Sequence, residues 1–371
     1  MYSSIRIQGY RGLDTFRLEG LGRLNLLVGP NNSGKTSILE CIELLRSAGE
    51  SHVLWSIAGR RGEWGLANEE HDRVPPGPRR EILDVSHLFA NRELNGTIEI
   101  EADLGTDDHP AGWNDKVTMW VEATSSSPND ESEAEDSGEN FVLRVEWSEG
   151  ADVKAFVTEN RFTEDGFLFG PPRPARTRNG SSRGVQFVRT SRMTPRDVVR
   201  AFSKFVLTPR HEIIRQALRI VEPKVEDLAP IADYRTRFSR EAPGGVVLRL
   251  SGVEDRVPIG SMGDGMWHML GLALSIADAD GGVLLIDEID TGLHYSVMEA
   301  MWRMLSKAAS ARSIQVFATT HSRDCYESLA AVAQGDGVDV TIQRIDSSRG
   351  EAVTFSREAI VAAAERNIEV R

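Results

Sequence analysis

The first fifty residues carry two kinds of apolar spacing. Residues 3–12 and 16–29 have the pattern of two strands joined by a glycine turn, and the second ends in the apolar run LNLLV. Residues 36–48 place apolar side chains such as Ile38 and Ile42 at helical spacing. The stretch GPNNSGKT therefore lies between a predicted strand and a predicted helix.

The middle of the chain has a different pattern. Segments that alternate apolar and polar residues predict an antiparallel sheet with one buried face. These segments are residues 95–104, 116–123, 140–147 and 151–159. Residues 194–206 and 211–228 are amphipathic segments that predict helices. The helix in the second segment should end at Pro223, which cannot continue a helix.

The end of the chain alternates between short apolar strands and helices. Strands are predicted at 244–252, 255–261, 281–288 and 313–322, helices at 265–280, 295–310, 323–333 and 357–370, and a hairpin at 340–355. The segment at 281–288 contains four consecutive apolar residues, Val283 to Ile286, which is typical of a strand buried on both faces, and 313–322 is expected to be another buried strand. The sequence therefore predicts an α/β fold that also contains an antiparallel β subdomain and inserted helices.

Three parts are predicted within this fold. Residues 1–50 and 246–371 should form the two halves of a split nucleotide-binding domain. Residues 51–245 should form an inserted region that is rich in strands and helices. A length of 371 residues exceeds one ordinary core, which agrees with more than one domain.

Charge is unevenly distributed along the chain. The formal net charge of −13 argues against a surface that attracts nucleic acid all over. Residues 171–200 hold eight arginines and one acid, Asp197. This segment either binds phosphate groups or an acidic partner, or is a basic loop that is simply solvated. Residues 122–140 are acidic, lack Lys and Arg, and predict a disordered surface loop.

Bulk features also bear on location and on cysteine chemistry. No apolar run is long enough to span a membrane and no leader pattern opens the chain, so a cytoplasmic protein is expected. Cys41 and Cys325 lack CxxC spacing, and both are expected to be buried and outside any disulfide or zinc site.

GPNNSGKT fits the phosphate-binding pattern G-x-x-x-x-G-K-[ST] through Gly29, Gly34, Lys35 and Thr36. The glycines let the backbone curl, so that successive N–H groups from Asn32 onward point into one concavity at the start of a helix. Lys35 is expected to neutralise the β and γ phosphates of ATP. The Thr36 hydroxyl is expected to be a ligand of Mg²⁺.

Three residues in the second half have the chemistry that a bound nucleotide needs. Asp287 and Glu288 directly follow an apolar run, and ligands bind at the carboxyl ends of parallel strands. Asp287 is expected to hold Mg²⁺ and Glu288 to take a proton from the attacking water. His321, at the end of a strand predicted to lie beside them, is expected to donate to the γ-phosphate and to hold that water.

A second glycine-rich motif, SMGDG, precedes another predicted helix. It contains Ser261, Gly263, Asp264 and Gly265. Such a helix start binds anions, and in a symmetric dimer it would face the nucleotide of the partner. Simple helix capping explains the same residues equally well.

Taken in chain order, GPNNSGKT, SMGDG, LLIDE, EIDTGLH and ATTHS resemble the Walker A, signature, Walker B, D-loop and H-loop motifs of ATP-binding-cassette (ABC) ATPases. The resemblance implies an ABC-type P-loop ATPase fold. Residues 1–50 and 245–371 are most similar to the ATPase part of the OLD (overcoming lysogenization defect) family, which is related to the SMC- and RecF-type ATPases. The resemblance does not include the Toprim nuclease domain of OLD nucleases. SMGDG departs from the usual LSGGQ signature, and no Q-loop glutamine is evident.

The resemblance implies a set of site residues. Glu288, His321 and Lys35 would be catalytic, and Thr36 and Asp287 would bind Mg²⁺. The residues implied to contact ATP are Gly29, Asn31, Asn32, Ser33, Gly34, Lys35, Thr36, Ser37, Arg11, Ser261, Gly263, Asp264, Gly265 and Asp290.

The resemblance also implies a way of working. The protein would hydrolyse ATP as a homodimer or larger assembly joined through the nucleotide, with Asp290 crossing the interface. It would hold or regulate a separate effector, such as a nuclease or toxin, in defence against phage. The alternative is a DNA-binding repair or recombination ATPase of the RecF/SMC type, with nucleic acid bound through residues 171–200. No membrane partner is expected.

Overall fold

The computed structural model divides the chain into two compact units. Unit 1 contains residues 1–19, 36–183 and 346–352, and unit 2 contains residues 20–35, 184–345 and 353–371. The residues that the structure describes are 1–66, 81–105, 113–124, 140–150, 156–163, 167–168, 184–188, 195–236, 239–279, 281–335, 337, 339–366 and 368. The domain limits predicted at residues 50 and 245 stay a prediction.

Unit 1 is built on an antiparallel sheet with the strand order β2-β1-β6-β7-β8-β9. Its strands are β1 (Tyr2–Tyr10), β2 (Leu13–Leu18), β6 (Thr97–Leu104), β7 (Asn114–Thr124), β8 (Asn140–Glu149) and β9 (Phe156–Thr163). In β6 every second residue is buried, which is the alternation that predicted this sheet. The prediction of an antiparallel sheet is therefore confirmed.

The remaining elements of unit 1 are short. They are α1 (Lys35–Arg46), whose first residue is counted with unit 2, α2 (Ser51–Arg61), the 3₁₀ turns Val85–Leu88, Ala90–Arg92 and Ser347–Arg349, and a small sheet of β4 (Trp64–Leu66), β5 (Glu81–Leu83) and β10 (Phe167–Leu168).

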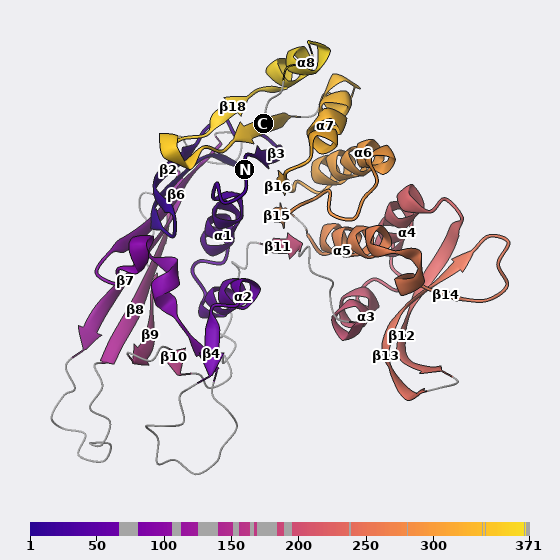
Figure 1. Cartoon of the computed structure of the whole chain (residues 1–371), viewed down its shortest axis with the longest axis horizontal. Helices are drawn as coiled ribbons and strands as arrows, with labels where there is room; N and C mark the ends of the chain where they lie inside the picture. The colour runs from indigo at the N-terminus through magenta and orange to yellow at the C-terminus, as the bar shows by residue number, and fades with distance from the viewer. Residues whose placement is uncertain are drawn as a thin grey trace. The chain divides into compact units, whose positions relative to one another are not determined.

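Unit 2 is built on a mostly parallel sheet with the strand order β11-β15-β16-β3-β17-β18 (Figure 1). Its strands are β3 (Leu24–Val28), β11 (Val185–Val188), β15 (Val283–Ile286), β16 (Gln315–Thr320), β17 (Val340–Arg344) and β18 (Val353–Phe355). β18 runs antiparallel to β17, and the other neighbouring strands pair in parallel. The α/β prediction is confirmed, as is the predicted hairpin near the end of the chain.

The helices of unit 2 are α3 (Pro195–Ser203), α4 (Arg210–Val221), α5 (Asp264–Asp278), α6 (Tyr295–Ala311), α7 (Arg323–Gly335) and α8 (Arg357–Glu365), with a 3₁₀ turn at Ile259–Met262. A second sheet joins β12 (Val225–Thr236), β13 (Ser239–Leu250) and β14 (Val257–Pro258), and α3 packs against its long hairpin.

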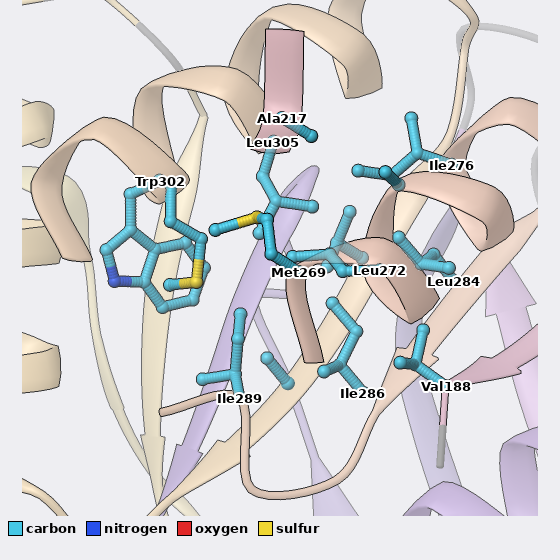
Figure 2. Packing of buried hydrophobic residues seen from close by; sticks show 14 of the residues in the cluster. Val188, Ala217, Met269, Leu272, Ile276, Leu284, Ile286, Ile289, Trp302 and Leu305 are labelled. Carbon is cyan, nitrogen blue, oxygen red and sulfur yellow. The ribbon is translucent and has the colours of Figure 1, made fainter. Parts of the chain in front are cut away.

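The core of unit 2 lies between the parallel sheet and its helices. The connections β15–α6–β16 and β16–α7–β17 step the same way along the sheet, so right-handed crossovers place α6 and α7 on one face. Figure 2 shows buried side chains of α5, α6 and β15, among them Met269, Trp302 and Ile286, packed against one another. This packing fixes the strand ends from which the candidate site extends.

The beginning of the chain differs from the prediction. The single strand predicted over residues 16–29 is wrong, because β2 ends at Leu18 and β3 begins at Leu24. Gly20, with a φ of 63°, turns the chain between them. β2 pairs within the sheet of unit 1, and β3 pairs within the sheet of unit 2.

The arginine-rich segment contains regular structure where it is described. Strand β11 pairs in parallel with β15, so the interpretation of this segment as a loop is wrong at residues 185–188. The helix predicted over residues 194–206 is confirmed by α3, which begins at Pro195. The apolar residues of VQFV are suited to extend the sheet edge. Residues 171–183 and 189–194 lie outside the described residues, as do residues 125–139 of the acidic segment.

Other expectations are met. The predicted helix end at Pro223 is confirmed, since α4 ends at Val221 and β12 follows. Cys41 and Cys325 are buried free thiols, as expected. Within the described residues, no helix combines the length and apolar character that crossing a bilayer requires.

Candidate active site

Three neighbouring parallel strands of unit 2 end at the same edge of the sheet. Val28 at the end of β3 pairs with Thr320 at the end of β16, and Ile286 at the end of β15 pairs with Ala318 of β16. The residues that directly follow these three ends are Gly29, His321 and Asp287. The predicted neighbourhood of β15 and β16 is confirmed, and the glycine-rich loop, the histidine and the acids gather at the carboxyl edge of the sheet.

The loop between β3 and α1 has the curled backbone of a phosphate cradle. Gly29, Asn32 and Gly34 have φ angles of 151°, 61° and 92°. A Cβ added at Gly29 would lie 2.7 Å from the carbonyl oxygen of Ile345, so only glycine fits there. Asn31 is exposed. The loop leads directly into the first turn of α1, where backbone N–H groups have no partner within the helix.

Lys35 lies inside this loop and is 5% exposed. Its ammonium group donates to the carbonyl oxygens of Gly29 (2.8 Å) and Pro30 (2.7 Å), and to the hydroxyl of Ser33 (3.4 Å). The side chain therefore folds back onto the cradle that precedes it in the chain.

The electrostatics of Lys35 link it to the two acids. Burial lowers the pKa of the Lys35 ammonium from its ordinary value to about 8, and the carboxylates of Asp287 and Glu288 act in the opposite direction. This agrees with the sheet geometry, because the strands β3 and β15, which precede the lysine loop and the two acids, end at the same edge.

Asp287 and Glu288 are held by β16. The hydroxyl of Thr319 donates to Oδ1 of Asp287 (2.6 Å) and accepts from the backbone N–H of Glu288 (2.7 Å). Glu288 has a φ of 48°, a conformation that is rare and costly for a residue with a side chain. Its exposed carboxylate accepts a hydrogen bond from the hydroxyl of Thr291 (3.1 Å). Asp287, the candidate metal ligand, is thus half-buried, and Glu288, the candidate base, is open to solvent.

Asp290 is held in a similar way by the adjacent threonine, because the hydroxyl of Thr320 donates to its Oδ1 (2.6 Å). The exposed His321 follows this threonine directly at the same edge.

The predicted signature segment forms the start of α5. The helix begins after Gly263, which provides no side-chain cap, and the hydroxyl of Ser261 donates to the carbonyl oxygen of Pro258 (2.6 Å). Ser261, Gly263 and Asp264 are exposed. The first turn of α5 therefore presents its N–H groups without a side-chain cap, which is the arrangement that a bound anion needs.

Two glycines join the start of α5 to the turn that follows β15. A Cβ added at Gly265 would lie 2.6 Å from the carbonyl oxygen of Gly292. Gly292 has a φ of 73°, and a Cβ there would lie 3.3 Å from Cβ of Asp264. The two segments therefore touch backbone to backbone, which side chains at these positions would prevent.

The predicted residues outside unit 2 lie in the first turn of α1 and in the β1–β2 turn. Thr36, directly after Lys35, is half-buried, and the hydroxyl of Ser37 accepts from Nη2 of Arg61 (3.2 Å).

Arg11 has partners of its own within unit 1. Its Nε donates to Glu40 (3.1 Å), and its Nη1 and Nη2 donate to the two oxygens of Glu63 (2.5 and 2.8 Å). These ion pairs give Arg11 a structural role that needs no nucleotide, and its contact with ATP stays a prediction.

Residues 24–324 match the protein family described as "AAA domain, putative AbiEii toxin, Type IV TA system". This match covers most of the chain and runs from the start of β3 into α7. The chain belongs to this AAA domain family. It includes an AAA-type ATPase domain, and the resemblance to the OLD family, which is narrower, stays a prediction.

Individual proteins are also similar to this AAA domain protein. An "ATP/GTP phosphatase" of Helicobacter pylori is 23% identical over 354 residues, which are 90% of this chain and 88% of that protein. The "Uncharacterized protein MJECL10" of Methanocaldococcus jannaschii is 42% identical over 55 residues, which are 15% of this chain and 25% of that protein.

Solved structures show a looser likeness. An SMC head bound to the C-winged helix domain of ScpA has a TM-score of 0.48 and 14% identity, with 96% of this chain and 97% of that chain covered. The SMC head domain from Thermotoga maritima has a TM-score of 0.42 and 12% identity, with 96% and 98% covered.

The sequence analysis missed four site residues of this AAA domain protein. Thr291 and Gly292 follow the acids, and Thr319 and Thr320 precede His321. A signal was present in the two threonines, because consecutive hydroxyls at the end of a strand predicted to be buried need hydrogen-bond partners. Which acids those partners are follows only from the pairing of β15 with β16.

Proposed function

We propose that this protein binds and hydrolyses ATP with Mg²⁺ at the carboxyl edge of the parallel sheet in unit 2. One observation carries the proposal: the glycine-rich loop with its buried Lys35 follows β3, and Asp287 and Glu288 follow β15, so that both lie at the same edge of the sheet with β16 between the two strands. A cation for phosphates beside two carboxylates for metal and water is the combination that ATP hydrolysis needs. Membership of the AAA domain family supports it.

The glycine-rich loop would bind the phosphates of ATP. N–H groups of the residues from Asn31 to Ser37 would donate to phosphate oxygens, and Lys35 would exchange its carbonyl partners for the β and γ phosphates. Glycine at position 29 keeps this curled backbone possible, because a Cβ there would lie 2.7 Å from the carbonyl oxygen of Ile345.

The residues present fit Mg²⁺. The Thr36 hydroxyl and the Asp287 carboxylate are hard oxygen donors, and Thr319 already orients the carboxylate. The described residues hold no group of three or more His, Cys, Asp or Glu side chains that would bind a metal by themselves. Mg²⁺ of this kind is held by one or two protein groups together with substrate phosphates, and it would neutralise charge on the γ-phosphate.

Glu288 would act as the general base. Its carboxylate is exposed, and the hydroxyl of Thr291 orients it, so it is placed to accept a proton from water. His321, at the end of the neighbouring strand, would donate to the γ-phosphate and hold the attacking water. Both residues would act on the same phosphate because their strands are neighbours.

The start of α5 would bind the γ-phosphate of ATP held by a second copy of the chain. The uncapped first turn after Gly263 supports this role for Ser261 to Gly265, and Asp290 would approach the same interface. ATP would then join two subunits in a homodimer or larger assembly.

Such an assembly would act as a nucleotide-dependent switch for a separate effector protein, such as a nuclease or toxin, in defence against phage. The family description, which names a putative toxin and a toxin–antitoxin system, supports this setting. ATP would favour one arrangement of the subunits, and hydrolysis by Glu288 would reverse it.

Measurement of phosphate release by the purified full chain tests the proposal. Release from ATP should require Mg²⁺ and should not change when duplex DNA is added. No release, with or without co-purifying protein, would overturn ATP hydrolysis as the function. Stimulation by DNA, with a DNA affinity that falls steeply as salt rises, would replace the effector switch by the DNA-binding ATPase of the RecF/SMC type.

ATP affinity should depend on pH through Lys35. Its pKa of about 8 means that the ammonium form, which pairs with phosphate, declines as pH rises above 8. The apparent Kd should therefore rise by up to about tenfold for each pH unit above 8, because only the protonated fraction binds. Titration of a fluorescent ATP analogue between pH 7 and 9.5 measures this. A Lys35→Arg variant keeps its charge in this range and should show a flat profile, whereas a flat wild-type profile would contradict the role of Lys35.

A further inference from the structure

Two adjacent threonines end strand β16 in the middle of the parallel sheet. Thr319 and Thr320 are each 1% exposed, and β16 lies between β15 and β3. A buried hydroxyl must find hydrogen-bond partners, so polar residues at such positions are rarely accidental. Because successive side chains of a strand point to opposite faces, the two hydroxyls reach different parts of the segment after β15.

Thr319 holds the first part of that segment with three hydrogen bonds. Its hydroxyl donates to Oδ1 of Asp287 (2.6 Å) and accepts from the N–H of Glu288 (2.7 Å), and its carbonyl oxygen accepts from the N–H of Ile289 (3.0 Å). The hydroxyl thus fixes the candidate metal ligand and the backbone of the candidate base at once. A φ of 48° at Glu288 persists only where neighbouring groups hold it, and Thr319 is such a group.

Thr320 holds the second part. Its hydroxyl donates to Oδ1 of Asp290 (2.6 Å) and accepts from the N–H of Ser322 (2.9 Å), the residue after His321. It therefore ties the segment after β15 to the segment after β16, at a residue that follows Glu288 by two positions and Asp287 by three.

We propose that Thr319 and Thr320 are positioning residues with separate tasks. Thr319 sets the geometry of Asp287 and Glu288 for metal binding and proton transfer, and Thr320 sets that of Asp290. This inference rests on the proposed ATP hydrolysis, and it adds the residues that orient its acids. Groups that orient a metal ligand act on the metal requirement, which a merely structural residue does not.

The test compares Thr319→Val, Thr320→Val and the matched control Thr341→Val. Valine has nearly the shape of threonine without the hydroxyl. Thr341 is also buried in the same sheet, on β17, and its hydroxyl donates to Oδ1 of Asn25 (2.9 Å), away from the acids. Two quantities are measured in each full-length variant: kcat, and the Mg²⁺ concentration for half-maximal binding of a fluorescent ATP analogue.

Thr319→Val should lower kcat by about tenfold or more and raise the half-saturating Mg²⁺ concentration by about tenfold, in line with the effect of other groups that orient metal ligands. Thr319→Ser, which keeps the hydroxyl, should restore both quantities. Thr320→Val and Thr341→Val should leave the Mg²⁺ requirement at the wild-type value. If Thr319→Val does not fold, Thr319→Cys provides the same comparison, because a thiol is a weak hydrogen-bond donor of similar size.

An unchanged Mg²⁺ requirement in folded Thr319→Val, or an equal loss in Thr341→Val, would overturn the inference. This failure is distinct from failure of the proposed function. If only the inference about the threonines fails, wild type still hydrolyses ATP and Glu288→Gln is slow. If the proposed function fails, wild type releases no phosphate.

Discussion

Glu288→Gln is expected to lower kcat for ATP hydrolysis by about 10² or more and to leave ATP binding intact. Glutamine has the same size as glutamate, and it still accepts the hydrogen bond that the Thr291 hydroxyl donates across 3.1 Å. Its neutral amide cannot accept a proton from the attacking water. The substitution also removes one negative charge near the phosphates, which reduces repulsion, so the affinity for ATP should not fall.

Single-turnover phosphate release and equilibrium binding separate the two effects. Glu299→Gln is a suitable control, because this glutamate lies exposed on α6, where it pairs with Arg303 (2.7 Å). Wild-type turnover in Glu288→Gln would exclude Glu288 as the base. The same variant tests the assembly, since a protein that retains ATP should sediment as a larger species with Mg²⁺ and ATP than without. An unchanged mass would contradict subunits joined by nucleotide.

Lys35→Ala is expected to weaken ATP binding by about 10² or more. The ammonium is the charged donor inside the glycine-rich loop, and hydrogen bonds between opposite charges in a shielded site are about twice as strong as neutral ones. When it is removed, the site loses one of the cations that offset the repulsion between the phosphates and the carboxylates of Asp287 and Glu288, so repulsion adds to the lost attraction.

Equilibrium binding of a fluorescent ATP analogue, with thermal unfolding as a check on folding, measures this effect. Burial lowers the pKa of Lys35 to about 8, so below that pH the charged ammonium destabilises the folded protein. Because Lys35→Ala removes this destabilisation, the variant should still fold at neutral pH. Lys307→Ala removes an exposed lysine from α6 and should bind ATP as wild type does. Wild-type affinity in Lys35→Ala would remove the central residue of the proposed site.

Local signals predicted much of the site. The spacing within GPNNSGKT is contained in eight consecutive residues, and a strand before it and a helix after it are visible in the apolar pattern. The continuous apolar run VLLI likewise predicted β15, and the apolar residues around Phe317 indicated β16, because strands that are buried on both faces are rich in apolar residues. The position of acids directly after such a strand then implied a ligand edge.

Contacts between distant residues were beyond the reach of the sequence. The hydrogen bond from Thr319 to Asp287 joins residues that are separated by 32 positions, and no local pattern specifies it. The split of the predicted strand at Gly20 was missed because leucines on both sides continue the apolar pattern through the turn. Similarly, VQFV within the arginine-rich segment forms a strand by pairing with β15, which is about 100 residues further along the chain. No pattern within the segment specifies that pairing.

The contact between Gly265 and Gly292 has a consequence for how this protein can vary. Each glycine is constrained by the backbone of the other segment, so neither position tolerates a side chain unless the opposite segment withdraws. The start of α5 and the turn that carries Glu288 therefore behave as a single mechanical part. A molecule that displaces one of them is therefore expected to displace the other through this backbone contact.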